Sequence, residues 1–369
     1  MATQQNRTDP AFDGKTVISV DAMGGDRGAA AVIAGLSRSA KKNPDISFIL
    51  HGDEAELKAL LRRRPLLSER TVIRHAATNI SMDEKPSKAL RRGKGSSMWS
   101  ALEAVASGDA TVAVSCGNTG ALMAMSMLQL RKLPNVGRPA IAVLWPSRNP
   151  AGYNILLDAG ADIRADAADL VQYAVMGASY ARNGLKLVRP RVGLLNVGTE
   201  LHKGRTQLRE AAEIITQIAP DGDFEFVGFV EGSDLPTAKV DVVVTDGFSG
   251  NVALKTAEGT ASLIRGLLRE AFAHTPLSRI GALFALTSLR RLHKRIDPRH
   301  VNGGVFLGLN GTVIKSHGGA DATGISAAIK LAFVLAHNGF SEKLARRVAS
   351  GLPRGEDSRQ NKGSEAGLG

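Results

Sequence analysis

The chain has 369 residues and a formal net charge of +12, with 43% hydrophobic residues, 4% aromatic residues, 40 glycines and one cysteine. One cysteine excludes an intrachain disulfide framework and a CxxC metal site, and no stretch approaches the roughly 18 apolar residues that span a bilayer. The first ten residues lack the apolar core of a signal peptide, and few aromatic side chains are available to stack on bases, so we expect a cytoplasmic protein with no nucleic-acid partner.

The first part of the chain alternates apolar strands with amphipathic helices. The expected strands lie at about 16–21, 46–51, 71–75 and 110–115. Helices are expected after Gly28 and from Glu54, and one long helix is expected at about 87–107. A polar turn and a helix follow the strand at 110–115.

The second part begins with two apolar runs, 141–146 and 153–160, that are too close together for an intervening helix. They predict an antiparallel pair or a change of sheet. Later strands are expected at 191–198, 224–232, 240–245 and from Gly311, and helices at about 166–183 and 204–219. The alternation predicts an α/β fold with a doubly wound, mostly parallel sheet between two helix layers, a three-layer α/β/α arrangement. We expect one domain at 14–345, an N-terminal tail at 1–13 and a disordered tail at 346–369.

Residues 240–259, VDVVVTDGFSGNVALKTAEG, combine a buried strand with a turn of glycines and short polar side chains. A helix pattern starts at Val252, with Asn251 or Ser249 as its N-cap. Ligands of open α/β sheets bind where a strand ends and a helix N-terminus offers free N–H groups. The segment therefore predicts a crevice for a small anionic ligand.

Five turns that follow strands carry glycine together with short polar side chains or lysine. Each glycine alone is usually only a tight turn, and each Asn or Thr only a helix cap. Five such turns in one sheet indicate a ligand, because we expect the strand ends to converge on one edge. The candidate ligand-binding residues are Asp21, Gly24, Gly25, Asn118, Thr119, Gly120, Asn196, Gly198, Thr199, Glu200, Asp246, Gly247, Ser249, Gly250, Lys255 and Lys315.

Missing motifs narrow the chemistry of this site. The chain has no GxxxxGK[ST], no GxGxxG with a ribose-binding acid and no HExxH, so we expect neither a nucleotide cofactor nor a metal ion. Ser249 lacks the GxSxG frame of a nucleophile elbow. Cys116 stands at a strand end where a thiol pKa can fall, although a small buried packing cysteine is commoner.

Without a covalent nucleophile in the protein, the ligand itself can be the nucleophile. Inorganic phosphate is a dianion at neutral pH and needs binding more than deprotonation. Backbone N–H groups and Lys203, Lys255 or Lys315 can hold it, and the same donors can stabilise an oxyanion on an attacked carbonyl. The residues alone thus indicate a phosphate-binding transferase.

Seven segments resemble, in the same order, the PlsX phosphate acyltransferase family of bacterial phospholipid synthesis. They are VDAMGGD, KPSKALRRGKGSSM, SCGNTGALMA, RPAIAVL, VGLLNVGTE, VVVTDGFSGNVALK and VIKSHGGADA. The resemblance implies an isocitrate/isopropylmalate dehydrogenase-like fold with a cleft. It also implies the conversion of fatty acyl-(acyl carrier protein) and phosphate to acyl phosphate and free carrier protein, by a family-type homodimer.

The resemblance implies roles for particular residues. Lys203 and Asn251 are expected at the developing oxyanion, and Asn118, Thr119 and Lys315 at phosphate or pantetheine. His317 either protonates the leaving thiolate or is a structural histidine at a strand end.

Two basic segments suit the partners that the resemblance implies. The surface around Lys88, Arg91, Arg92 and Lys94 can steer the acidic carrier protein. Residues 275–300 predict a helix with a basic face, and it is either a core or dimer helix or a helix that lies on anionic lipid. Its candidate membrane residues are Ile280, Leu283, Phe284, Leu289 and Leu292.

The resemblance favours the membrane interpretation, with the product passed to a downstream membrane glycerol-phosphate acyltransferase. The alternatives are a phosphotransacetylase that acts on short acyl-CoA and a non-catalytic lipid-binding protein of the same fold.

Overall fold

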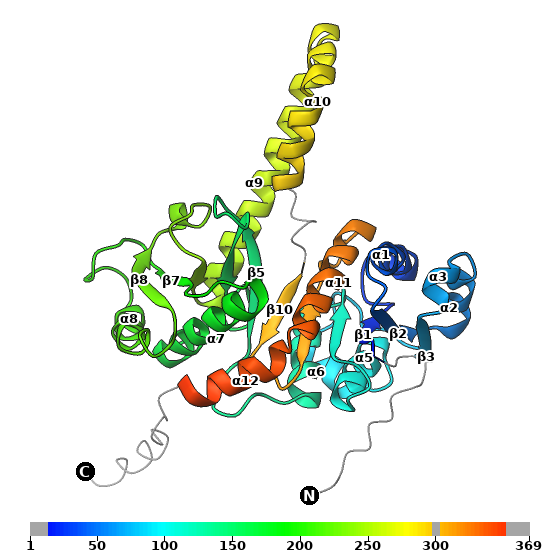
Figure 1. Ribbon diagram of the computed structural model, residues 1–369, viewed down its shortest axis with the longest axis horizontal. Coiled ribbons are helices and arrows are strands. Elements are labelled where there is room, and N and C mark those ends of the chain that lie inside the picture. Colours follow the sequence, from blue (N-terminus) through cyan, green and yellow to red (C-terminus); the bar gives the residue numbers. More distant parts are fainter. Residues whose placement is uncertain (1–13, 297–302, 352–369) are drawn as a thin grey trace, which may run out of the picture.

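The computed structural model describes residues 14–296 and 303–351, and these residues form one sheet of 11 strands (Figure 1). The strand order is β3-β2-β1-β4-β11-β10-β5-β6-β9-β7-β8. The strands are β1 (Thr16–Asp21), β2 (Ile46–Gly52), β3 (Thr71–His75), β4 (Val112–Ser115), β5 (Ala140–Pro146), β6 (Tyr153–Leu157), β7 (Arg191–Leu195), β8 (Glu225–Val230), β9 (Val242–Val244), β10 (Gly304–Leu307) and β11 (Thr312–Lys315).

Neighbouring strands are parallel except at three pairings, β11 with β10, β10 with β5 and β5 with β6. The predicted mostly parallel sheet is therefore confirmed, and so is the antiparallel pair β5–β6.

Side chains of each strand alternate between two cores, because successive residues point to opposite faces of a sheet. On β4, Val112 and Val114 face one core and Ala113 faces the other. The first face is covered by α1 (Gly28–Lys42), α2 (Glu54–Leu61), α3 (Pro65–Ser68), α7 (Ala167–Leu185), α8 (Thr206–Ile218), α11 (Ala322–His337) and α12 (Phe340–Gly351). The second face is covered by α4 (Pro86–Arg92), α5 (Ser97–Ala106), α6 (Thr119–Gln129) and the start of α9 (Gly247–Ala273). The fold is a three-layer α/β/α arrangement.

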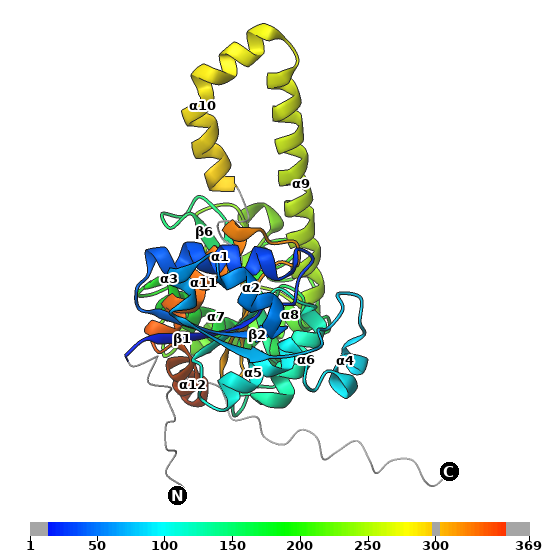
Figure 2. The same cartoon turned by 90° about the vertical axis from the view of Figure 1, so that its right-hand side faces the viewer.

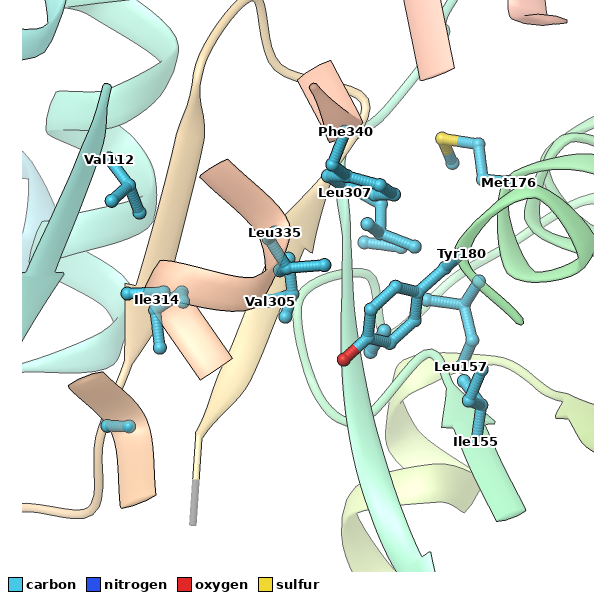
Figure 3. Close-up of a cluster of buried hydrophobic side chains, with 14 of the residues drawn as sticks. Val112, Ile155, Leu157, Met176, Tyr180, Val305, Leu307, Ile314, Leu335 and Phe340 are labelled. Carbon is cyan, nitrogen blue, oxygen red and sulfur yellow. The ribbon is translucent and has the colours of Figure 1, made fainter. Parts of the chain in front are cut away.

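Figure 3 shows the middle of the first core, where strand residues such as Val305 and Leu157 meet helices from distant parts of the chain. The Tyr180 ring of α7 contacts the edge of Phe340 of α12, with ring centroids 5.6 Å apart. Leu335 of α11 is fully buried beside them. Each such side chain contributes roughly 1.5–3 kcal/mol by leaving water, so α7, α11 and α12 hold the centre of the sheet together.

The single long helix predicted at 87–107 is wrong, because the structure has two helices there, α4 and α5. Gly95 between them has φ +86°, which a helix does not accommodate. Ser96 then starts α5 as its N-cap by accepting a hydrogen bond from the amide of Trp99 at 3.2 Å.

The predicted C-terminal tail begins too early. Helix α12 continues to Gly351, and Val348 is fully buried in the first core, so residues 346–351 belong to the folded domain. Residues 1–13 and 352–369, where the tails were predicted, lie outside the described residues. Strand β10 is an addition that the sequence pattern did not predict.

Helices α9 and α10 (Pro276–Ile296) form an antiparallel hairpin that projects from the α/β body (Figures 1 and 2). Helix α9 has 27 residues, so it is about 40 Å long. Thr275 and Ser278 cap α10 reciprocally, with each side-chain oxygen accepting from the other residue's amide at 2.9–3.0 Å. The predicted helix at 275–300 is confirmed as α10, apart from 297–300, which lie outside the described residues. Within the described chain, no helix combines the length and apolarity that a membrane span requires.

Candidate functional site

Three neighbouring parallel strands, β1, β4 and β11, end side by side. Asp21 pairs in register with Ser115, and Ser115 with Lys315, so the three residues form a row across the sheet. The Ser115 hydroxyl donates to Asp21 Oδ2 at 2.7 Å, and the Ser316 amide donates to the Ser115 carbonyl at 2.9 Å. The prediction that strand ends converge is confirmed for these three strands.

Glycines allow the turns after these strands to approach one another. A Cβ on Gly25 would lie 2.9 Å from Cys116 Cβ and 3.2 Å from the Gly318 carbonyl. The amide of Asp26 donates to the same carbonyl at 3.0 Å. The turns after β1, β4 and β11 therefore form one backbone-rich surface.

Asp21 lies at the base of this surface and is 1% exposed. Burial raises the pKa of its carboxyl, against hydrogen bonds from Ser115 and from the Met23 amide. A Cβ on Gly24 would overlap Asp21 Oδ2, so the carboxylate requires the glycine. These contacts place Asp21 under the turn as its support.

Lys315 supplies a cation at the same place. Burial lowers the pKa of its amine to about 8, with Cys116 and Asp21 acting in the opposite direction and Lys255 adding to the decrease. The Lys315 Nζ donates to the Cys116 carbonyl at 3.4 Å and to the Ser316 carbonyl. An amine of this kind is charged in most molecules at neutral pH and can attract an anion.

Helix α6 begins directly behind this row, with Asn118 as its N-cap. Asn118 Oδ1 accepts from the Ala121 amide at 3.0 Å, and Nδ2 donates to the carbonyls of Met82 at 2.6 Å and Glu84 at 2.9 Å. The Asn118 side chain thus supports the turn. Thr119 is exposed at the first position of α6, where backbone N–H groups have no helical partner.

His317 lies two residues after Lys315 and is exposed. Its Nδ1 accepts from the Gly319 amide at 3.2 Å, so the neutral ring carries its proton on Nε2. The predicted role of His317 as a general acid stays a prediction.

Cys116 is not suited to nucleophilic attack. Its side chain is 5% exposed, and burial raises the pKa of the thiol although Ser316 and Lys315 act in the opposite direction. Because the thiolate is the nucleophilic form, a raised pKa supports the packing interpretation.

The predicted convergence of all five strand ends on one edge is wrong. Three antiparallel pairings separate β11 from β6, and β6, β9 and β7 are parallel to one another. Strands β7 and β9 therefore run opposite to β1, β4 and β11, and their carboxyl ends lie at the other edge of the sheet.

The second group of predicted residues surrounds the start of α9, which begins at Gly247 with Asp246 as its N-cap. The predicted start at Val252 is thus wrong. Asp246 accepts from the Ser249 amide at 2.8 Å and the Ser249 hydroxyl at 3.0 Å, and it pairs with Arg205. Burial opposes ionisation of Asp246, but the bonds from Ser249 and Arg205 lower its pKa overall.

The turn after β7 is held by its own side chains. Asn196 Nδ2 donates to the Lys203 carbonyl at 3.1 Å, and Lys203 Nζ pairs with Glu200 at 2.7 Å. The Glu200 carboxylate raises the pKa of Lys203. A Cβ on Gly198 would overlap the Lys203 side chain, and Thr199 is exposed. Lys203 therefore lies on a surface turn in the second group, not in the row with Lys315.

Two buried carboxylates, Asp158 and Asp162, were not predicted from the sequence. Asp158 accepts four backbone N–H groups, among them Ile141 at 2.7 Å and Asp162 at 2.6 Å, and burial raises its pKa to about 6. Asp162 pairs with Arg138 at 3.0 Å and accepts from Tyr173 at 3.1 Å. The sequence signal for them is a pair of aspartates four residues apart in LDAGAD, directly after an apolar strand.

Helix α9 connects the two groups. A Cβ on Gly160 would lie 3.4 Å from Asn251 Cβ, so Asn251 faces the loop that Asp158 holds. One turn further along α9, Leu254 packs against the core behind β4 and β11. Lys255 follows, pairs with Glu258 at 2.8 Å, and is close enough to Lys315 to lower its pKa. The candidate site is the region that the row Asp21–Ser115–Lys315, the start of α6 and this part of α9 surround.

The remaining predicted residues lie outside this region. Lys88, Arg91, Arg92 and Lys94 are exposed on and beside α4. On α10, Ile280, Leu283 and Phe284 are 51%, 66% and 87% exposed, and Leu289 is half-buried. The side chain of Leu292 lies outside the described residues.

Known proteins are similar to this chain along nearly its whole length. A sequence model described as "Fatty acid synthesis protein" matches residues 16–343. The phosphate acyltransferase of Dinoroseobacter shibae is 68% identical over 335 residues, which cover 91% of this chain and 87% of that protein. The phosphate acyltransferase of Ruegeria pomeroyi is 63% identical over 366 residues, 99% of this chain and 98% of that protein.

Solved structures share the fold at low sequence identity. A phosphotransacetylase from Streptococcus pyogenes has a TM-score of 0.57 and 17% identity, and the match covers 92% of this chain and 96% of that one. A branched-chain phosphotransacylase from Enterococcus faecalis has a TM-score of 0.55 and 15% identity, covering 87% and 99%. The family match and the relatives at this identity show that the chain belongs to the phosphate acyltransferase family.

Proposed function

We propose that this chain transfers a fatty acyl group from acyl carrier protein to inorganic phosphate, and so makes acyl phosphate for bacterial phospholipid synthesis. The observation that carries the proposal is the row Asp21–Ser115–Lys315, where a partly buried amine, glycine turns and the start of α6 provide an anion site. The relatives' name, phosphate acyltransferase, supports phosphate as the anion and acyl transfer as the reaction.

In the proposed reaction, phosphate attacks the thioester directly. Lys315, Lys255 and the backbone N–H groups at the start of α6 hold the dianion. A phosphate oxygen forms a bond to the carbonyl carbon and the C–S bond breaks. The proton that the dianion HPO4²⁻ loses goes to the leaving pantetheine thiolate, with His317 as the proposed relay. The raised pKa of Cys116 supports this single displacement over an acyl-cysteine intermediate.

Asn251 is the proposed donor to the developing oxyanion, because it is exposed on the first turns of α9, between the Gly160 loop and Lys255. Lys203 is proposed for the same charge. Its exposed side chain is paired with Glu200, so it would have to leave that partner when the thioester binds.

The proposed donor and product agree with two exposed surfaces. The cations of α4 suit an acidic carrier protein, and the apolar side chains of the α9–α10 hairpin suit the surface of an anionic membrane. The same proposal includes three further properties. They are peripheral membrane association, a homodimer and transfer of acyl phosphate to a membrane glycerol-phosphate acyltransferase.

The rival enzyme is a phosphotransacetylase that uses short acyl-CoA, which the shared fold favours. An acetyl group has no need for the exposed apolar hairpin. A non-catalytic lipid-binding protein would not require the partly buried Lys315 amine at the end of β11, so this amine argues against that alternative.

The test is phosphate-dependent release of carrier thiol from palmitoyl carrier protein by the purified chain. We expect release with this donor and far less with acetyl-CoA. Activity with acetyl-CoA alone would support the rival enzyme, and no release with either donor would overturn the proposal.

Charge reversal tests the carrier surface within the same assay. Arg91→Glu/Arg92→Glu should lower kcat/KM for acyl carrier protein by about tenfold or more at low salt, because steering depends on charge. Arg62→Glu/Arg63→Glu makes the same charge change at exposed residues beyond α2 and is the matched control. Equal losses in both variants would show that only net charge matters.

A further inference from the structure

Helix α4 packs closely against α6 at both of its ends. A Cβ on Gly120 of α6 would lie 2.7 Å from Pro86 Cγ, at the first turn of α4. A Cβ on Gly93, at the end of α4, would overlap Met125 Cε of α6. Contacts this close leave little room for α4 and α6 to move independently. A displacement of α4 therefore also displaces the start of α6.

Residues 81–84, which lead into α4, are held by one side chain. Asn118 Nδ2 donates to the carbonyls of Ser81, Met82 and Glu84 at 3.4, 2.6 and 2.9 Å. Its Oδ1 caps α6 at the Ala121 amide. One side chain therefore ties the entry to α4 to the helix terminus at the anion site.

The same segment touches the turn that carries Lys315. A Cβ on Gly318 would lie 2.7 Å from Met82 Cε, and Gly318 accepts from the amide of Asp26. Met82 is 38% exposed. Residues 81–84 thus connect α4 to the turns after both β1 and β11.

The exposed side of α4 is strongly basic. Five exposed cations lie in ten residues, namely Lys85, Lys88, Arg91, Arg92 and Lys94. Glu84 forms an ion pair with Lys88 at 3.7 Å. Asp83 is the only other acidic residue in 81–94. The occupant that fits this surface is an acidic protein, and the thioester chemistry of the adjacent site makes it the acyl carrier protein.

We propose that Asn118 is a positioning residue that couples docking of the acidic carrier protein on α4 to the anion site at the start of α6. A docked carrier fixes α4 and residues 81–84, and Asn118 then holds the first turn of α6 in the arrangement that binds phosphate. The inference rests on the proposed function and adds that the carrier accelerates transfer beyond delivering its thioester.

Asn118→Asp separates the two halves of this side chain. A carboxylate still accepts from the Ala121 amide, so the cap of α6 is kept. The amide that donated to the carbonyls of 81–84 becomes an oxygen that repels them, so the connection to α4 is lost. Asn338→Asp is the matched control, because Asn338 Nδ2 donates to the Asn183 carbonyl at 3.2 Å, at the end of α11.

The experiment compares kcat for two donors, palmitoyl carrier protein and palmitoyl-pantetheine, which has the same thioester without the protein. Wild type should favour the carrier donor, and Asn118→Asp should lower that preference about fivefold or more, the usual size of a coupling between sites. The KM for carrier protein should change less than kcat, because the α4 cations are intact. Asn338→Asp should keep the wild-type preference.

An equal loss of kcat with both donors would overturn the proposal, since a merely structural asparagine acts on both alike. An effect on the carrier KM alone would overturn it as well. If thermal unfolding shows that Asn118→Asp does not fold, Gly120→Ala tests the same connection, because the added methyl group would push Pro86 away from α6. If wild type releases no thiol from either donor, the proposed function itself is wrong, an outcome distinct from an active wild type without a preference.

Discussion

His51 is a fully buried histidine near the carboxyl end of β2. Its Nε2 lies 2.8 Å from the Ser19 hydroxyl and its Nδ1 2.8 Å from the Ser100 hydroxyl. The ring thus joins β1, β2 and α5 behind the candidate site. Burial, with a smaller contribution from Arg74, lowers the pKa of His51 to about 3, so the folded protein keeps the ring neutral.

This burial makes stability fall with acid. The unfolded chain binds a proton at His51 below about pH 6.5, whereas the folded chain does so only near pH 3, so stability is lost as pH falls through that window. Between about pH 7.5 and pH 5.5, His51 alone should remove about 1.4 kcal/mol of unfolding free energy. Urea unfolding of wild type and His51→Gln at both pH values should show this difference in wild type only.

His75→Gln, at the exposed end of β3, is the control for this measurement and should keep the wild-type pH dependence. The same pH dependence in His51→Gln as in wild type would show that other groups cause it.

At the scale of elements, α9 is the helix that belongs to both the candidate site and the hairpin. Its first turn packs against the loop that Asp158 holds, where a Cβ on Gly250 would overlap the Asp158 carbonyl. The overlapping atom is backbone, so it cannot rotate away. Gly259, about two and a half turns further along, has no atom within 4 Å of its Cβ position.

These two glycines predict opposite effects in one helix. Gly250→Ala should destabilise the protein by about 1–3 kcal/mol through overpacking and displace Asn251. Gly259→Ala should stabilise it by about 0.5–1 kcal/mol through helix propensity. Urea unfolding of both variants checks the pair, and stabilisation by Gly250→Ala would show that α9 does not pack on Asp158 in solution.

The same helix shows what the sequence could predict at this scale and what it could not. The strand before α9 was predicted because four of the five residues 240–244 are valines, which are apolar and β-branched. The helix start was misplaced because Gly247 and Gly250 are poor helix formers, whereas contact with Asp158 requires them. A tertiary contact from a distant loop decided the boundary, and no local pattern contains it.

At the scale of the whole molecule, the direction of the sheet reverses through the short strand β10 and the pair β5–β6. Strand composition predicts that strands exist, but not which edges pair or how many pairings are antiparallel. Lys315 and Lys203 were therefore placed in one site from the sequence, and the structure puts them at turns of oppositely directed strands. Asp21 and Lys315 were brought together correctly because β1, β4 and β11 are parallel neighbours.

The α9–α10 hairpin projects from the α/β body (Figure 2). Leu277, Leu283 and Phe284 are 78%, 66% and 87% exposed, and a water-exposed apolar surface of this kind marks an interaction site. Together with the basic residues of α10, these side chains suit insertion between anionic headgroups.

Leu283→Glu should weaken binding to phosphatidylglycerol-containing vesicles by about tenfold or more, because burying one leucine is worth about 1.5–3 kcal/mol. Co-sedimentation at fixed salt measures the affinity. Leu66→Glu makes the same change on α3 of the body, where the leucine is 53% exposed, and should bind like wild type. If Leu283→Glu and Leu66→Glu bind equally well, lipid contacts the protein through its net charge and not through the hairpin.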